Sequence, residues 1–375
     1  MEVISNMTMR FVKRGEIDKK KQIAITIIAI VLALATSGIF LLLLNLNPIE
    51  VYGAIIKGAL GNKISFRQTI IKAIPLAITG LGIAVAFKMK YWNIGGEGQI
   101  LMGAFGAALI ALKIPNLPKS IMLSTMFISG MFFAGIWAFI PGYFRAKWRV
   151  NESITTLMMN YIALKYVTYL QYGPWKDKKA LGFPKIANFE DNAILPKILN
   201  INIGWIIALV LAVIVYMFLN RTKKGFEIAV IGESEKTAKY SGIKIQKTML
   251  EAIVISGVIC GIAGVVQASG VSETLSVEVA GGVGYTAIII ACLAKHNPFM
   301  ITIVSFLFAT LVQGGTYIQT IYSVPDAVAL IIQAMILFFV LGSEIFVNYK
   351  VVFKNNIIAK VDNTMTDKAL IMEVE

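Results

Sequence analysis

Residues 23–46 read IAITIIAIVLALATSGIFLLLLNL, a stretch of 24 residues without a charged side chain. At about 1.5 Å per residue, a helix of this length crosses a hydrocarbon core about 30 Å thick. Only a helix satisfies its own backbone groups over such a stretch in lipid. A basic lead precedes the stretch, but its apolar core exceeds the about 7–15 residues of a signal peptide and no cleavage signal follows. We therefore expect an uncleaved membrane anchor.

Similar apolar blocks recur along the chain. Of its 375 residues, 57% are hydrophobic and 15% are charged, whereas soluble proteins have roughly 45–50% and about 25%. The fold class predicted is therefore an all-α polytopic membrane protein. Reading the blocks against charged breaks predicts about ten spans, approximately at 23–46, 69–88, 97–113, 120–144, 153–171, 203–220, 248–270, 283–294, 299–317 and 326–347. The short apolar piece at 51–60 is interpreted as interfacial.

Basic loops orient these spans. Excess Lys and Arg in the leader, at 145–149 and at 221–247 predicts that all three are cytoplasmic, and the span count adds the C-terminal tail. The 172–202 loop holds five Lys against two Asp and one Glu, yet the count places it outside, because long loops translocate despite their charge. The predicted organisation is a cytoplasmic segment at 1–22, a transmembrane domain at 23–347 and a cytoplasmic tail at 348–375.

The placement of charges and cysteines, and the motifs that are missing, argue against several classes of function. The net charge of +14 does not indicate nucleic-acid binding, because the Lys and Arg lie between apolar blocks. Cys260 and Cys292 fall inside predicted spans and, with His296, make neither a disulfide framework nor a metal site. No phosphate-binding loop, zinc motif, nucleophile elbow or haem motif is present. We therefore nominate no catalytic residue, metal or cofactor, and a membrane-embedded enzyme is the least favoured class.

The third and eighth spans are short and open with glycine-rich segments, at 93–98 and at 280–284. They are the third span of the first five and the third of the second five. Because an odd number of spans makes the two halves run in opposite senses, this placement predicts an inverted 5+5 repeat. Short, glycine-interrupted segments at matching places in two halves indicate a transport pathway at mid-membrane depth.

The strongest local signal is YWNIGGEGQ at 91–99. Glu97 lies at the entrance of an apolar helix, where an ionised carboxylate is costly unless it is paired or hydrated. Asn93 suits a helix cap, Glu97 gains from the helix dipole, and the glycines allow close backbone approach. Two interpretations remain: a discontinuous helix facing a polar pathway, or a capped and tightly packed helix.

Polar residues elsewhere allow similar alternatives. Asn151 is a predicted N-cap, and Asn160 lies deeper in the same span, where it is either interhelical glue or part of a pathway. Gln267, Gln313 and Gln319 are weaker pathway candidates. Gly257, Gly261 and Gly264 form a small-residue pattern for close helix packing.

The 221–247 segment is the longest predicted cytoplasmic connection. Residues 233–240 suit two helical turns flanked by Gly232 and Gly242, which favour stop or turn positions. The segment is either a knob for docking a partner or a solvated basic loop.

At 93–99, 151–163 and 225–242, the sequence resembles permease subunits of ATP-binding-cassette importers, in the nucleoside and simple-sugar branch (ribose-type, binding-protein-dependent). The resemblance is colinear from about 69 to 347, and NIGGEGQ at 93–99 is its most specific motif. It implies a multi-pass permease of a bacterial cytoplasmic (inner) membrane that moves nucleosides, or a related simple sugar, into the cell.

The resemblance also implies partners: a second related permease subunit, a cytoplasmic ATP-binding-cassette ATPase, a lipid-anchored extracytoplasmic binding protein and membrane lipids. ATP hydrolysis would take place on the partner, with 221–247 as the coupling loop. The pathway residues nominated are Asn93, Gly95, Gly96, Glu97, Gln99, Asn160, Gln267, Thr286 and Gln313. The coupling residues nominated are Gly225, Glu227, Gly232, Ala238, Tyr240 and Gly242.

The sequence departs from the family pattern in places. Ala229 stands where similar sequences usually carry Arg, Ser234 and Glu235 replace Asn-Pro, and Thr286 stands in place of an acid. The last change lies near the expected pathway and leaves the exact solute open. A self-contained secondary carrier or channel is the alternative function, although intramembrane carboxylates are scarce.

Overall fold

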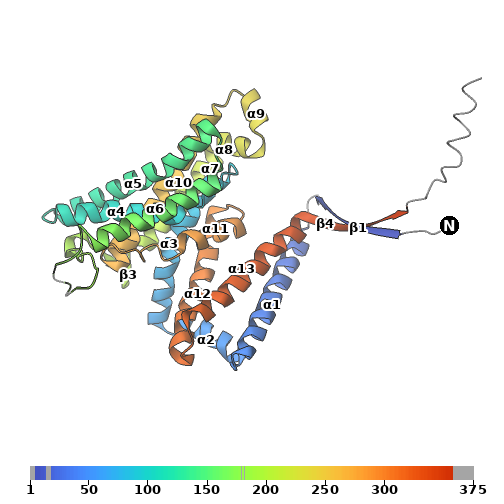
Figure 1. Cartoon of the computed structure of the whole chain (residues 1–375), viewed down its shortest axis with the longest axis horizontal. Coiled ribbons are helices and arrows are strands. Elements are labelled where there is room, and N and C mark those ends of the chain that lie inside the picture. The colour runs from blue at the N-terminus through green and yellow to red at the C-terminus, as the bar shows by residue number, and fades with distance from the viewer. Residues whose placement is uncertain (1–4, 14–17, 179, 181, 358–375) are drawn as a thin grey trace, which may run out of the picture. The chain divides into compact units, whose positions relative to one another are not determined.

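The computed structural model describes residues 5–13, 18–178, 180 and 182–357, and the described chain is mainly helical (Figure 1). The helices are α1 (Lys19–Leu43), α2 (Pro48–Leu60), α3 (Lys63–Phe87), α4 (Gly96–Lys113), α5 (Lys119–Trp148), α6 (Glu152–Tyr172), α7 (Gly204–Arg221), α8 (Lys223–Glu233), α9 (Glu235–Tyr240), α10 (Ile245–Gln267), α11 (Val283–Leu293), α12 (Pro298–Tyr322) and α13 (Asp326–Asn348). The strands are β1 (Ser5–Lys13), β2 (Lys197–Ile198), β3 (Ile201–Asn202) and β4 (Tyr349–Ile357), with a 3₁₀ turn at Asp191–Ala193 and a π-helical turn at Ala268–Ser272.

Seven of the described helices are long and apolar enough to cross a membrane: α1, α3, α5, α7, α10, α12 and α13. The prediction of an α-helical polytopic membrane protein is therefore confirmed. The other three predicted spans also form helices, but α4 and α6 carry polar residues in their first turns and α11 has only 11 residues. The total of ten spans stays a prediction. The apolar piece predicted at 51–60 lies within α2.

Helix α3 lies at the centre of the packing. Its apolar window is 83% buried, against 67% for α10 and 28% for α5 and α7. Three helices from the second half of the chain, α10, α11 and α12, pack against α3. In turn α10 packs against α3, α4 and α5. Helices α3 and α10 therefore form a shared core, against which α4 and α11 begin.

The small residues of α10 explain how it approaches its neighbours. A Cβ at Gly264 would collide with the Ile100 carbonyl oxygen of α4, and one at Gly261 would collide with Ala134 of α5. Gly257 is equally close to Ala138, one turn further along α5. The predicted close packing at these three glycines is confirmed, and any side chain there would force the helices apart.

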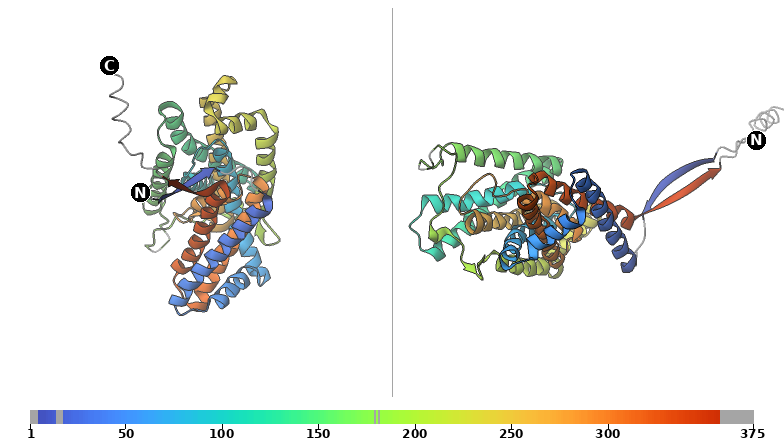
Figure 2. Two further views of the ribbon diagram at one scale, coloured as in Figure 1. Left: turned by 90° about the vertical axis from the view of Figure 1, so that its right-hand side faces the viewer. Right: turned by 90° about the horizontal axis from the view of Figure 1, so that it is seen from below.

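The two ends of the chain pair with each other, which the sequence reading missed. Strands β1 and β4 form an antiparallel ladder from Ser5 opposite Ile357 to Lys13 opposite Tyr349. β-Branched and aromatic residues, which favour extended pairing, make up five of the nine residues of β4, and the two strands run side by side in the right-hand view of Figure 2. The predicted terminal segments at 1–22 and 348–375 lie partly outside the described residues. Within the described part of the chain, the residues up to 37 and those from 335 onward form one compact unit, and the residues between them form another.

Candidate functional site

Glu97 joins the starts of α4 and α11, the two short helices singled out in the sequence. Its Oε1 accepts a hydrogen bond from the Gly282 N–H at 2.7 Å, and its Oε2 accepts one from the Gly284 N–H, also at 2.7 Å. Backbone N–H groups at a helix start lack partners within the helix, and a carboxylate is the ligand they favour. One side chain from the first half of the chain therefore caps a helix of the second half.

Gly284 makes this approach possible. A Cβ at this position would collide with the backbone nitrogen of Glu97 and lie 2.6 Å from its Cα. Gly282, with φ of +79°, adopts the left-handed conformation that aims its N–H at the carboxylate and that favours glycine. We call Glu97, Gly282 and Gly284 the carboxylate clamp.

Asn93 holds the turn before α4 and is fully buried. Its amide exchanges hydrogen bonds of 3.1 Å with the Gln99 amide and donates another, of 3.0 Å, to Ser256 Oγ of α10. Its Oδ1 also accepts from the Gly95 N–H. The predicted cap role is wrong in detail: Gly95 is the N-cap and has no side-chain cap bond, because Asn93 lies two residues too early.

Asn160 caps α4 from a neighbouring helix instead. Its Oδ1 accepts from the Gly98 N–H at 2.8 Å, and its Nδ2 donates to the Ile94 carbonyl at 2.9 Å. A longer contact of 3.4 Å reaches the Tyr285 hydroxyl of α11. Asn151, further back, caps α6 as predicted, because its Oδ1 accepts from the N–H groups of Ser153 and Ile154.

Helix α4 begins beside the interior of α3 and not beside the end of α3. A Cβ at Gly96 would contact Ile83 and Thr79, which lie four and eight residues before the last residue of α3, Phe87. At about 1.5 Å per residue this difference is roughly 6–12 Å. With 11 residues, α11 spans roughly 16 Å, about half of a hydrocarbon core. Because the clamp joins the two helix starts, both lie at the same depth within the bundle.

A cavity of about 320 Å³ opens beside the clamp. Gly282 belongs both to the clamp and to the cavity wall. The polar groups of the wall come from four helices: Lys72 of α3, Gln267 of α10, Thr286 of α11 and Gln333 of α13. Lys72 also donates a hydrogen bond of 2.9 Å to the Thr316 hydroxyl of α12, in a solvent-exposed contact. The cavity therefore reaches the surface.

The nominated pathway residues fall into three places. Gln267 and Thr286 line the cavity, and Glu97 lies behind its wall. Asn93, Gln99, Asn160 and the glycines at 95 and 96 gather at the start of α4, where their polar atoms bind one another or backbone groups. Gln313 does not line the cavity, although its neighbour Val312 does.

Lys72 and Gln333 were missed in the sequence. Lys72 lies near the start of a predicted span, so it reads as a flanking residue of the kind that reaches back to the interface. An ionisable residue inside a span was nevertheless a usable signal. The amide of Gln333 is a weaker signal of the same kind, because amides inside spans commonly serve only to join neighbouring helices.

The predicted coupling loop folds as two helices. We predicted one helix at 233–240, and α9 occupies 235–240, because Ser234 caps it by accepting from the Thr237 N–H at 3.2 Å. Helix α8 before it was not predicted. Gly232 lies inside α8 and does not end it: a Cβ there would collide with the Lys88 carbonyl at the end of α3. Gly242, with φ of +73°, makes the predicted turn.

The other residues nominated for coupling have distinct positions. A Cβ at Gly225 would collide with carbonyl oxygens at the end of α7, so this glycine seats α8 against that helix. Within α9, Ala238 is fully buried, whereas Tyr240, the last residue of the helix, is 93% exposed. Helix α9 therefore presents an aromatic ring outward from a well-anchored base.

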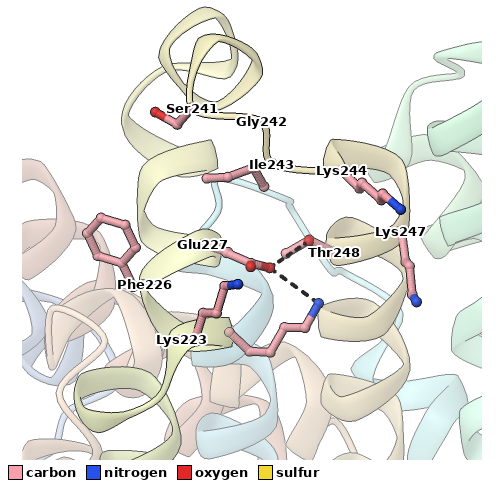
Figure 3. Close-up of a pocket in the computed structure, with 10 residues that line it drawn as sticks. Lys223, Phe226, Glu227, Ser241, Gly242, Ile243, Lys244, Lys247 and Thr248 are labelled. Carbon is pink, nitrogen blue, oxygen red and sulfur yellow. Dashed lines mark hydrogen bonds and ion pairs between the residues drawn. The ribbon is translucent and has the colours of Figure 1, made fainter.

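A second cavity, of about 360 Å³, lies between α8, residues 241–244 and the start of α10 (Figure 3). Glu227 accepts from Lys224 at 3.2 Å and from the Thr248 hydroxyl at 3.1 Å, and Lys224 also binds Glu251 at 2.7 Å. The hydrogen bond to Glu251 raises the pKa of Lys224. Partial burial works to raise the pKa of Glu227, but its hydrogen bonds from Lys224 and Thr248 outweigh this effect and lower it.

The chain is similar in sequence to a family of transport permeases and to several named members of such systems. The family model described as branched-chain amino acid transport system / permease component matches residues 65–341. The chain is 30% identical to a glucose ABC transporter permease protein of Haloferax volcanii, over 87% of this chain and 88% of that protein. It is 31% identical to a nucleoside ABC transporter permease protein of Lactococcus lactis subsp. cremoris, over 86% and 92%. It is 29% identical to a guanosine ABC transporter permease protein of Bacillus subtilis, over 87% and 95%.

Proposed function

The chain belongs to the branched-chain amino acid transport system permease family, and from this premise we propose that it carries nucleosides, or a related simple sugar, into the cytoplasm as the permease subunit of an ATP-binding-cassette importer. The observation that carries the proposal is the alignment over at least 86% of this chain with relatives named as permeases for glucose, nucleosides and guanosine. Two of these three names concern nucleosides, which favours that class of solute.

The proposed pathway combines the cavity with the carboxylate clamp. In the orientation that the basic loops predict, α3 enters from outside and α10 ends outside. Lys72, early in α3, and Gln267, the last residue of α10, then belong to the outer half of the bundle. The cavity is the outer part of the pathway in this proposal, and the clamp is its floor. Asn93, Gln99 and Asn160 are positioning residues that hold the start of α4 in place.

Ten spans arranged as an inverted repeat complete this proposal. Strands β1 and β4, which flank the first and last spans, pair directly, so both ends of the span series belong on one side of the membrane. This requires an even number of crossings, and adding α4, α6 and α11 to the seven long apolar helices brings the number to ten. The repeat is supported by matched packing: α3 packs against α11 and α12, as α10 packs against α4 and α5.

Residues 223–242 are the proposed coupling segment, seated on a cytoplasmic ATPase. Support comes from the exposed Tyr240 ring on a helix whose base is buried, and from Gly232, which brings α8 against the end of α3. A push on α9 would pass through α8 to α3, against which α11 and the clamp lie. The other proposed partners are a second permease subunit, a lipid-anchored binding protein and the lipids of a bacterial inner membrane.

Purification from the native membrane tests this function. We expect the tagged chain, extracted in mild detergent, to bring along an ATPase, a second permease and a lipoprotein identified by mass spectrometry. Reconstituted together, they should take up guanosine only with ATP. The Tyr240→Ala variant should lose the ATPase, whereas Lys236→Ala, at an exposed lysine of the same helix, should retain it. Uptake by the purified chain alone, driven by an ion gradient, would instead establish a self-contained carrier.

A further inference from the structure

The second cavity, of about 360 Å³, lies where two membrane spans end. Helix α7 ends at Arg221, and α10 begins at Ile245. The residues that line the cavity fall within 223–227 and 241–248, directly after the first span and at the start of the next. With 18 residues, α7 covers about 27 Å, close to the thickness of the hydrocarbon core. The cavity therefore lies at the level of the lipid headgroups.

Lysines dominate the charge of this cavity. Four lysines and one carboxylate belong to its described lining: Lys223, Lys224, Lys244, Lys247 and Glu227. Glu227 and the neighbouring Glu251 both bind Lys224, at 3.2 and 2.7 Å, and Glu251 also lies 3.9 Å from Lys247. Even with Glu251 counted, two negative charges meet four positive ones. The excess of two positive charges makes the cavity a site for an anion.

The excess charge belongs to Lys223 and Lys244. Both side chains are exposed, and neither makes a hydrogen bond or ion pair with a residue that the structure describes. Lys223 attracts Glu227 only through its longer-range charge. The two lysines come from different walls, Lys223 from α8 and Lys244 from the start of α10 (Figure 3). Their flexible four-carbon stems allow both ammonium groups to bind one shared anion.

Apolar surface next to the cavity indicates where this anion comes from. Phe226, in the cavity wall, is 66% exposed. Val213 and Met217, one helical turn apart on α7, are also exposed, and Met217 lies four residues before the end of that span. Exposed apolar side chains on a membrane span suit acyl chains, whereas a water-borne anion has no use for them. Basic pockets at the ends of spans are known to bind anionic lipid headgroups.

We propose that the second cavity binds the headgroup phosphate of an anionic phospholipid, with Lys223 and Lys244 as its ligands and the apolar face of α7 against its acyl chains. In the orientation that the basic loops predict, this lipid belongs to the cytoplasmic leaflet. The phosphate would join α8 to α10 and so hold the proposed coupling segment against the core. The inference needs only the membrane spans and does not rest on the transported solute.

The test is lipid binding by the full chain, purified in a nonionic detergent. It is titrated with phosphatidylglycerol and with phosphatidylcholine of the same acyl chains, and bound lipids are counted by native mass spectrometry. We expect a lower Kd for the first phosphatidylglycerol than for phosphatidylcholine. Lys223→Gln combined with Lys244→Gln should raise the Kd for phosphatidylglycerol at least fivefold, because one lysine near an anionic headgroup strengthens binding by roughly fivefold. A smaller rise would overturn the proposal.

Two matched variants separate this cavity from the general basic surface. Lys236→Gln combined with Lys239→Gln removes the same charge from exposed lysines of α9 that do not line the cavity, and should leave the Kd unchanged. Lys223→Arg combined with Lys244→Arg keeps the charge and should keep the binding. An equal loss in the α9 variant would show that phosphatidylglycerol is held by net charge alone, and the proposal would then be wrong.

Other occupants of the cavity would give different results. If an excess of glycerol 1-phosphate displaced phosphatidylglycerol, the cavity would be a site for soluble phosphate compounds and not for a lipid. If Lys223→Gln with Lys244→Gln lost the copurifying ATPase but bound phosphatidylglycerol as before, the lysines would contact an acidic segment of that partner. Either result would overturn the proposal. ATP-dependent guanosine uptake is a separate measurement, so a failure of the proposed function would leave the lipid result intact.

Discussion

At the scale of single residues, Glu97 connects two segments that lie 185 and 187 positions apart in the chain, through bonds to Gly282 and Gly284. Both acceptors of the carboxylate are used, and both donors belong to the start of α11. A neutral amide at this position has one acceptor oxygen, and its NH₂ group would face the second N–H.

We therefore expect Glu97→Gln to destabilise the protein by about 1–3 kcal/mol, because one buried N–H loses its partner. ATP-dependent uptake should fall as well, since the clamp is the proposed floor of the pathway. The measurement is thermal unfolding in detergent beside uptake by the reconstituted complex. Glu278→Gln, at an exposed carboxylate before α11, is the control and should change neither. An unchanged unfolding temperature for Glu97→Gln would contradict the clamp.

Gly284→Ala tests the same contact from the other side. The added Cβ would meet the backbone of Glu97, which cannot rotate away as a side chain would. We expect a loss of about 1–3 kcal/mol of stability. Gly53→Ala, in a helix position where a Cβ meets nothing within 4 Å, should be neutral or stabilise the protein by about 0.5–1 kcal/mol. Equal unfolding temperatures for the two variants would show that α4 and α11 are not in close contact.

At the scale of elements, α8 and α10 are joined by Glu227, Lys224, Thr248 and Glu251. Because this cluster lies between the proposed coupling segment and the core helix α10, its integrity decides whether α8 moves as part of the bundle. The two helices come from separate stretches of the chain, so their connection depends on side chains more than on the intervening turn.

The pKa of Glu227 gives this junction a pH dependence. Its pKa is lowered on folding from an ordinary value of 4.5, so the stabilisation is present above pH 4.5 and is lost as the pH falls through the lowered value. We expect the unfolding temperature of Glu227→Gln to lie below that of the unsubstituted protein at pH 7 and to converge with it in acid. Glu233→Gln, at the exposed end of α8, should show no such convergence. A constant difference at all pH values would exclude an ionised Glu227 from the junction.

At the scale of the whole molecule, the number of spans decides how the loops are distributed. Ten spans place the loop at 114–118 and the long connection at 172–202 outside, and residues 241–244 inside. The long connection is the sharpest test, because its excess of lysines argues for the opposite side.

Single cysteines at exposed loop positions, in the chain with Cys260→Ala and Cys292→Ala, check this distribution. On intact cells, an impermeant maleimide should label Asn116→Cys and Asn188→Cys. Ser241→Cys should react only after the membrane is permeabilised. All three side chains are exposed, so absent labelling would reflect sidedness and not burial. Labelling of Ser241→Cys from outside, or of Asn188→Cys only from inside, would require a different number of spans.

The sequence alone determined the features that depend on local chemistry. Long apolar blocks such as 23–46 must be helices in lipid, because no other local structure satisfies their backbone groups. Glycines at 257, 261 and 264 had to lie at close helix contacts. The terminal pairing of β1 with β4, and α8 in place of a loop, escaped prediction because they depend on pairing or packing with distant segments.

The sequence by itself predicted only part of the candidate site. Glu97 stood out in the sequence because a carboxylate at the start of an apolar helix needs a partner, but nothing local identifies that partner as the backbone of Gly282 and Gly284. Lys72 reads in sequence as a flanking lysine, and the tertiary structure makes it the charged residue of a cavity built from four helices. The physical reason is the same for both: composition sets the cost of a buried charge, whereas the packing of distant helices decides what meets it.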